Sequence, residues 1–157
     1  MGEACERLQP GRANQIRLLR EPGRYPEFKV RDLAANGEVW TGNGEETRRH
    51  FPDLSNLPKD NLPNENMCSI AIRISYGAFD YFTGGDLTCD TEETGESWRD
   101  IETEVARAAG PVDVAVANHH AYFDAVGPNF VRLLRTRVFI VQAGMLRTRA
   151  SSSFAEC

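Results

Sequence analysis

Hydrophobic and polar residues alternate along residues 27–40, and this stretch predicts a β-hairpin. Phe28 and Val30 are separated by a charged residue, so their side chains fall on one face of an extended strand. Asn36-Gly37 follows, which is the dipeptide that a two-residue type I′ turn prefers. The chain then resumes an apolar pattern, as expected for a returning strand.

A second pair of strands is predicted over residues 69–83. Tyr76-Gly77 reverses the chain in the middle, and the segments on either side both have a period of two. Asp80 alternates with apolar residues and is expected on the solvent face of its strand. The first segment places three isoleucines on one face: Ile70, Ile72 and Ile74.

The pattern that follows alternates helices with strands. Apolar residues recur at helical spacing over residues 98–108, and a strand is predicted over residues 112–117. Gly127-Pro128 opens a second short helix, because proline is favoured in the first turn, and a last strand is predicted over residues 137–142. This order predicts an α/β fold in which a mixed sheet packs against helices.

Residues 41–66 show no regular pattern and predict a long loop, because glycine and proline interrupt every short run. Loops of this length are often functional. His50 lies within it. Since no second metal ligand occurs at a motif spacing from His50, we interpret it as a solvent-exposed loop histidine.

Composition and charge place the 157-residue chain among ordinary globular proteins, with 41% hydrophobic and 26% charged residues. The net charge of −5 offers no overall attraction to a phosphate backbone, so nucleic-acid binding is not expected. There is no apolar run of about 18 residues and no apolar core of a secretory signal. The four cysteines form no C-x-x-C pair. We therefore expect a cytoplasmic protein with reduced thiols and no membrane partner.

Candidate metal ligands follow two of the predicted strands. Asp86 comes after a double glycine, and His119 and His120 come after the strand over residues 112–117. A carboxylate and imidazoles that converge at strand ends are ligands for zinc or another divalent cation. Spacing alone leaves two other interpretations open, a glycine turn capped by Asp86 and a hydrogen-bonded structural pair of histidines. Cys89 is interpreted as a structural cysteine, since no thiolate cluster surrounds it.

Two segments resemble the C-terminal half of the metallo-β-lactamase fold. Residues 64–87, NENMCSIAIRISYGAFDYFTGGDL, are similar to a stretch of the DNA-internalisation competence protein ComEC and its soluble relatives. In that stretch an Asn and a Ser precede a strand, an aromatic-Gly turn follows, and a second strand ends in Gly-Asp. Residues 112–121, VDVAVANHHA, are similar to the family's strand followed by His-His-Gly. The resemblance implies a partial αββα sandwich, with a mixed sheet and helices on one face.

The same resemblance implies a metal-dependent hydrolase. Asp86 resembles the carboxylate that bridges the two metals or binds the second one. One of His119 and His120 resembles the last metal-binding histidine, and His119 is preferred. In this family a metal-bound hydroxide attacks an ester, amide or phosphoester. The resemblance thus implies zinc, with manganese or iron as alternatives, a small-molecule or phosphoester substrate, and catalytic roles for Asp86 and His119.

The sequence also departs from the family. The leading His-x-His-x-Asp-His motif is absent, since the chain has only three histidines, and Ala121 stands where the family has a glycine. Adjacent histidines on an extended strand point to opposite faces, so two ligands are expected rather than three. We therefore expect an incomplete domain. It would have an irregular segment with a hairpin and a long loop over residues 1–60, the metallo-β-lactamase-like half over residues 61–142, and a disordered tail over residues 143–157.

Three functions are compatible with this pattern. The first is a metal-dependent hydrolase present as an incomplete domain and inactive alone. The second is a degenerate, non-catalytic relative that binds a partner or a small ligand, and the third is a small α/β interaction module unrelated to the family. Self-association or a separate N-terminal half would complete the first. An exposed apolar face on the sheet would point to such a missing part.

Overall fold

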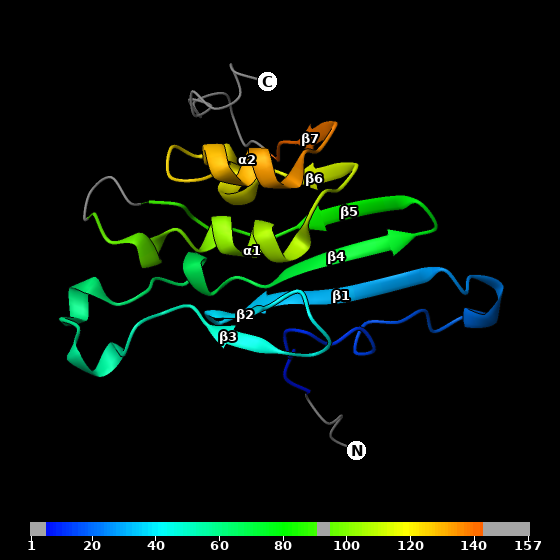
Figure 1. Ribbon diagram of the computed structural model, residues 1–157, viewed down its shortest axis with the longest axis horizontal. Helices are drawn as coiled ribbons and strands as arrows, with labels where there is room; N and C mark the ends of the chain where they lie inside the picture. Colours follow the sequence, from blue (N-terminus) through cyan, green and yellow to red (C-terminus); the bar gives the residue numbers. More distant parts are fainter. Residues whose placement is uncertain (1–5, 91–94, 143–157) are drawn as a thin grey trace.

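The computed structural model describes residues 6–90 and 95–142, which form one seven-stranded mixed sheet with two α-helices (Figure 1). The sheet order is β3-β2-β1-β4-β5-β6-β7. The predicted α/β class is confirmed, and the expected tail over residues 143–157 lies outside the described residues. The elements are β1 (Phe28–Ala35), β2 (Glu38–Trp40), β3 (Thr47–Arg49), β4 (Ala71–Tyr76), β5 (Phe79–Thr83), α1 (Ile101–Ala109), β6 (Val114–Val116), α2 (Pro128–Leu134) and β7 (Val138–Ile140).

The predicted hairpin is formed by β1 and β2. Asn36 and Gly37 have φ angles of 52° and 76°, the positive values that a type I′ turn needs at both central residues. A side chain at position 37 would overlap the ring of Phe51, so the turn also requires glycine for space. The hairpin prediction is confirmed, and its turn packs against the loop that follows.

The loop expected over residues 41–66 contains a third strand. β3 pairs antiparallel with β2 along three residues, from Thr47 opposite Trp40 to Arg49 opposite Glu38. Its sequence, Thr-Arg-Arg, has no apolar alternation, because it lies at the edge of the sheet and its side chains are largely exposed. Short edge strands of this kind carry no period-two signal.

A single sheet runs across the boundary expected near residue 60. β1 pairs antiparallel with β4, from Phe28 opposite Tyr76 to Ala34 opposite Ala71. β4 in turn pairs with β5, as the predicted turn at Tyr76-Gly77 requires. The N-terminal strands are therefore part of the same sheet as the strands that carry the candidate ligands.

Both helices lie on the same face of the sheet (Figure 1). The ring of Phe130 on α2 contacts the rings of Phe82 on β5 and Phe139 on β7, with centroid distances of 5.5 and 6.2 Å. α1 starts at Ile101, later than predicted, because the Asp100 side chain accepts a 2.9 Å hydrogen bond from the backbone N–H of Thr103 and caps the helix. A 3-10 turn occupies the preceding residues.

Polar side chains of the central strands face the helices. Arg73 on β4 donates to both carboxylate oxygens of Asp80 on β5, at 3.0 and 2.6 Å, and also to the carbonyl of Ala109 at the end of α1. The prediction that Asp80 lies on a solvent face is wrong. Period-two alternation assigns residues to two faces, but it does not say which face the helices cover.

The opposite face of β4–β7 is apolar and is not covered by α1 or α2. Cross-strand pairing places ten side chains on it, and we call these residues the open face. None of the ten is charged, and Tyr76, Phe79, Val138 and Ile140 are 42–51% exposed. The open face consists of Ile72, Ile74, Tyr76, Phe79, Tyr81, Thr83, Val114, Val116, Val138 and Ile140.

The continuation of this face on β1 is covered by N-terminal residues. Backbone hydrogen bonds join Asp32 to Gly11 and Arg12, at 2.7 and 2.9 Å. Ile16 of the covering segment and Val30 of β1 line one hollow of about 160 Å³. The N-terminal segment therefore covers β1 and reaches β4 at Tyr76, whose ring lies 6.3 Å from that of Tyr25, while Phe79, Val138 and Ile140 stay exposed.

Candidate functional site

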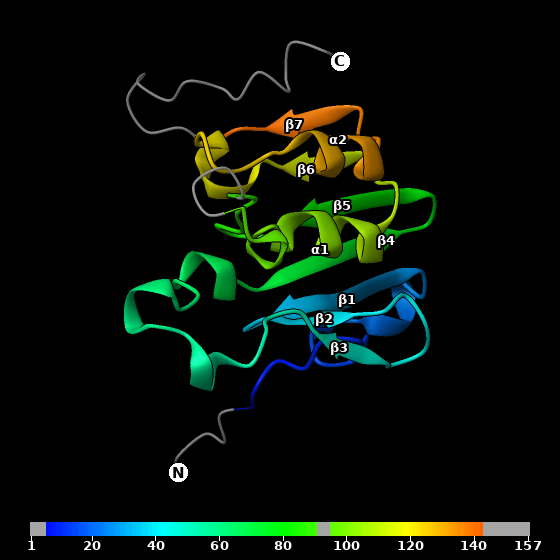
Figure 2. The same ribbon diagram turned by 60° about the vertical axis from the view of Figure 1, so that its left-hand side comes forward.

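The candidate ligands gather at one edge of the sheet. β5, β6 and β7 are parallel, and β4 runs the opposite way (Figure 2). The C-terminal ends of the three parallel strands therefore meet at the same edge. Asp86 follows β5 there, and His119 and His120 follow β6. Strand ends of this kind commonly carry the ligand-binding residues of α/β proteins.

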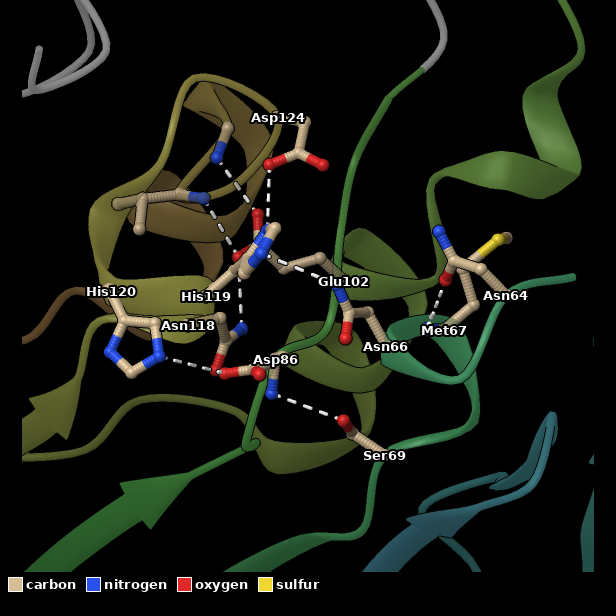
Figure 3. A network of polar contacts seen from close by, with 12 residues as sticks. Asn64, Asn66, Met67, Ser69, Asp86, Glu102, Asn118, His119, His120 and Asp124 are labelled. Atoms are coloured by element: carbon tan, nitrogen blue, oxygen red, sulfur yellow. Dashed lines mark hydrogen bonds and ion pairs between the residues drawn. The ribbon is translucent and has the colours of Figure 1, made fainter. Parts of the chain in front are cut away.

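Asp86 and His120 point toward one another (Figure 3), with Oδ1 of Asp86 3.7 Å from Nε2 of His120. Both side chains are partly exposed, at 41% and 51%. The backbone N–H of Asp86 donates to Ser69 Oγ at 3.1 Å, which fixes the turn that carries the carboxylate.

The tautomer of His120 is set by its second ring nitrogen. Nδ1 lies 2.8 Å from the carbonyl oxygen of Gln142, and since a carbonyl only accepts, Nδ1 carries the hydrogen. In the neutral ring, Nε2 then presents a lone pair toward Asp86. Metal-binding histidines characteristically donate their other N–H to a backbone carbonyl in this way.

His119 has different partners. Its Nδ1 donates to Asp124 Oδ1 at 2.8 Å, and its Nε2 accepts from the side-chain amide of Asn66 at 3.3 Å. The structure thus brings Asp86 next to His120 and pairs His119 with Asp124. The resemblance favoured His119 as the metal ligand that accompanies Asp86, whereas in the structure His120 is the histidine next to Asp86.

The two histidines do not lie on an extended strand. His119, His120 and Ala121 have φ angles of 45°, 57° and 57°, a run of left-handed residues in the 3-10 turn Asn118–Ala121. The prediction that the two rings point to opposite faces of a strand therefore does not apply, and their centroids are 6.4 Å apart. Left-handed backbone costs about 1 kcal/mol or more for each L-residue, so surrounding contacts must hold this turn.

Glu102 on α1 supplies those contacts. Its buried carboxylate accepts hydrogen bonds from the side-chain amide of Asn118 at 2.9 Å and from the backbone N–H groups of Val126 and Gly127 at 2.8 Å each. Burial raises the pKa of Glu102 to about 7, while these hydrogen bonds act in the opposite direction. Glu102 therefore ties α1 to both ends of the loop that carries the histidines.

Sequence reasoning missed Glu102. A signal was present, because Glu102 lies three residues before Val105 and seven before Ala109, on the buried face of α1. A carboxylate on such a face is rarely left without partners. Its partners could not be inferred, since they come from a distant loop.

The double glycine before Asp86 has a steric role. A Cβ atom at position 84 would lie 2.6 Å from Oδ1 of Asn118, closer than real Cβ contacts come. Asn118 is fully buried, and this oxygen has no hydrogen-bond partner within the part of the chain that the structure describes. Gly84 thus makes room for the residue that precedes the two histidines.

The donor set fits part of a metal site. Asp86 Oδ1 and His120 Nε2, 3.7 Å apart, can both lie about 2.1 Å from one zinc ion. Within residues 6–90 and 95–142, however, no group of three or more His, Cys, Asp or Glu side chains could hold a metal ion. Burial and nearby carboxylates raise the pKa of the Cys89 thiol, which disfavours the thiolate and agrees with a structural role.

His50, the third histidine, lies elsewhere. It is half-buried, and its Nε2 donates to the carbonyl of Trp98 at 2.7 Å, so the prediction of a solvent-exposed histidine is wrong. Burial lowers its pKa. It lines a hollow of about 440 Å³ with the ion pair of Arg48 and Glu104. This hollow shares no residue with the site at Asp86.

Comparison with known proteins adds no assignment: no model of a known protein family matches the sequence, and no curated protein matches it. Among the described residues, no helix has the length and apolar character needed to cross a bilayer.

Proposed function

We propose that this chain carries part of the active site of a metal-dependent hydrolase, with Asp86 and His120 as metal ligands. The observation that carries the proposal is the 3.7 Å approach of Asp86 Oδ1 and His120 Nε2, with the His120 tautomer set by the carbonyl of Gln142. The resemblance of residues 64–87 and 112–121 to the metallo-β-lactamase fold supports the same assignment.

The protein's own groups have distinct roles in this proposal. Asp86 supplies a negatively charged carboxylate oxygen to the metal ion, and His120 supplies the lone pair of a neutral ring nitrogen. A bound divalent cation supplies Lewis acidity and lowers the pKa of water, as needed to cleave an ester or phosphoester. Zinc suits this oxygen and nitrogen donor pair, with manganese or iron as alternatives.

His119 is a proton acceptor in the same proposal. Asp124 holds its Nδ1–H, and the side-chain amide of Asn66 donates to the lone pair on Nε2, so Asn66 must release this nitrogen before it accepts a proton from substrate or water. A carboxylate that orients an imidazole in this way is the usual arrangement of a general base. In this proposal the role of His119 changes from the metal ligand that the resemblance implied to a general base, and His120 takes the role of ligand.

The proposed site is incomplete in one chain. Two ligands fall short of the three or four protein ligands that zinc normally has. The open face is where a complementary half would pack, because sheets that pack face to face bury apolar side chains of this kind. We therefore propose that this chain hydrolyses nothing until another surface covers the open face.

Metal titration tests the assignment. Calorimetry on the metal-free chain should detect Zn²⁺ and Mn²⁺, and the Asp86→Asn and His120→Ala variants should each weaken binding at least tenfold. Mn²⁺ is informative because it prefers oxygen and nitrogen ligands and so avoids the four thiols. Asp60→Asn and His50→Gln are matched controls away from the site. Unchanged affinity in the Asp86 and His120 variants would remove the proposal.

A second candidate is a non-catalytic binding module. The observation in its favour is that Asp86–His120 and His119–Asp124 lie at this edge as separate pairs, and no three such side chains of the described residues could hold a metal ion together. In that case the Asp86–His120 pair is a surface ion pair, and the open face alone carries the function. A chain that binds a partner equally well with and without a chelator, and with Asp86→Asn, would favour this candidate.

A further inference from the structure

We propose that the N-terminal segment over residues 6–20 is a pH-sensitive strap, which is released from β1 when the buried carboxyl group of Asp32 loses its proton. We call residues 6–20 the strap; they run alongside β1 (Figure 1). The inference does not depend on the proposed hydrolase function, because no step of it uses Asp86, His119 or His120.

The side chain of Asp32 is buried without a partner. It is 1% exposed, and among the described residues neither Oδ1 nor Oδ2 has a hydrogen-bond partner. Asp32 lies two residues after Val30 on β1, so both side chains are directed to the same face of the sheet. A buried carboxylate without a hydrogen bond or an ion pair costs free energy, and proteins rarely contain one. The protonated acid is therefore the form that fits this structure.

The strap is attached to β1 at Asp32 itself. The backbone N–H of Gly11 donates to the carbonyl oxygen of Asp32 at 2.7 Å, and the N–H of Asp32 donates to the carbonyl oxygen of Arg12 at 2.9 Å. Farther along the strap, Ile16 lines one hollow with Val30, which is 2% exposed. Release of the strap therefore lets water reach Asp32 and Val30 together.

Arg31 does not supply the missing partner. It is the neighbour of Asp32 on β1 and its charge favours the carboxylate, but its guanidinium donates to the carbonyl oxygens of Gly11 and Gly44. Burial outweighs this charge and raises the pKa of Asp32 from 3.8 to about 6. The carboxyl group therefore ionises within the physiological range while the strap still covers it.

The other elements around Asp32 offer it no described ion pair. On β4 the residue opposite is Ile72, and the adjacent Arg73 is paired with Asp80 on the helix-covered face. The strap, β2 and the turn after β2 contribute four further charged side chains, which line a separate hollow of about 350 Å³: Arg7, Arg12, Glu38 and Glu45. These charges are balanced, two against two. Movement of the strap is therefore the response that solvates an ionised Asp32.

The expected change in the strap follows from the two states of Asp32. Covered, its pKa is about 6, and in water it returns to 3.8, so the protonated acid keeps the strap closed and the carboxylate favours release. The equilibrium constant for release should rise about fiftyfold from pH 4 to pH 7. Release uncovers Val30, which pairs with Ile74 across β1 and β4 and extends the open face onto β1.

Native-state hydrogen exchange on the full chain tests the proposal. The protection of the Gly11 amide, corrected for the intrinsic effect of pH, should fall about fiftyfold from pH 4 to pH 7 in the natural sequence. It should change less than threefold in Asp32→Asn, which does not titrate in this range. Asp60→Asn, at an exposed position, is the matched control and should behave as the natural sequence. Asp32→Ala replaces Asp32→Asn if the latter does not fold by circular dichroism.

Low concentrations of urea separate release of the strap from global unfolding. Release exposes little surface, so exchange at Gly11 should be nearly independent of urea, whereas exchange at Val112, which donates to the carbonyl of Leu134 at 2.9 Å, should accelerate. Protection of Gly11 that is independent of pH, or equally dependent on pH in Asp32→Asn, would overturn the proposal. Exchange at Gly11 that matches Val112 in rate and urea dependence would also overturn it, because the strap would then open only when the whole chain unfolds.

Discussion

The side-chain amide of Asn118 donates a 2.9 Å hydrogen bond to the carboxylate of Glu102, which joins the residue before the two histidines to the first turn of α1. Both residues are completely buried. The same carboxylate also holds Val126 and Gly127, at the far end of the histidine loop. The position of the candidate ligands therefore depends on Glu102, although the described hydrogen bonds of Glu102 go to Asn118, Val126 and Gly127 and not to the ligands themselves.

Replacing Glu102 should destabilise the fold and disturb the site together. Glu102→Ala removes the acceptor of three buried hydrogen bonds, and we expect the free energy of unfolding to fall by about 3 kcal/mol or more. Urea denaturation measures this loss. Glu104→Ala on the same helix removes a partly exposed ion pair with Arg48 and should cost less than about 1 kcal/mol. Equal effects of the two variants would contradict the role of Glu102.

The contribution of Asp32 to stability should fall as pH rises between about 4 and 6. Asp32 is 1% exposed, and neither of its carboxylate oxygens has a hydrogen-bond partner among the described residues. Burial raises its pKa from 3.8 to about 6, against the opposing charge of Arg31. Folding therefore favours the protonated acid, so its contribution is fully present below pH 3.8 and is lost as pH rises through 6.

Asp32→Asn should flatten this part of the profile, because an amide does not titrate in this range. The difference between the two proteins should amount to about 2 kcal/mol between pH 4 and pH 7. Thermal or urea unfolding at several pH values measures it, and Asp60→Asn, at an exposed position, serves as control. In the profile that persists, Glu102, whose pKa is raised to about 7, contributes with the same sign, and His50, whose pKa is lowered by burial, contributes with the opposite sign. An unchanged profile in Asp32→Asn would exclude Asp32 as the source.

Gly84→Ala should displace Asn118. The added methyl group would lie 2.6 Å from Asn118 Oδ1, and we expect a loss of about 2 kcal/mol in unfolding free energy. The metal affinity of the Asp86–His120 pair should fall as well, since the histidines follow Asn118 directly. Gly23→Ala is the control, because nothing lies within 4 Å of its added methyl group.

Ala121→Gly should be nearly neutral. Ala121 has a φ of 57°, so glycine relieves about 1 kcal/mol of left-handed strain, and this gain offsets the lost burial of one methyl group. Ala106→Gly, at an equally buried position within α1, should cost about 2 kcal/mol, because helix propensity and burial are both lost. Urea denaturation of the two variants gives the comparison. Similar losses at both positions would show that position 121 carries no strain.

The elements with strong local signals could be predicted from sequence. The turn at Asn36-Gly37 needs only the preference of two residues for positive φ, and the start of α2 needs only the proline at position 128. β3 could not be predicted, since three polar residues become a strand only through pairing with β2. The inward position of Asp80 also depended on long-range packing against α1.

The location of the candidate site could be predicted from the sequence, but the histidine that lies next to Asp86 could not. Residues that follow strands β5 and β6 were expected near one another, and the structure puts Asp86 and His120 there. Which histidine faces Asp86 depends on three consecutive left-handed residues, for which nothing in the local sequence gives a signal. Glu102 on α1 stabilises that conformation through hydrogen bonds to Asn118 and Val126, so it depends on tertiary contacts that the local sequence does not reveal.

The inward turn of Arg73 and Asp80 has a consequence for the life of the chain in a cell. The ion pair of Arg73 and Asp80 lies on the helix-covered face, so the open face has no charged side chain that would keep a folding intermediate soluble. We expect newly made chains to stay accessible to chaperones and proteases until a surface covers this face. We therefore expect the abundance of this protein to track the supply of that surface rather than its own rate of synthesis.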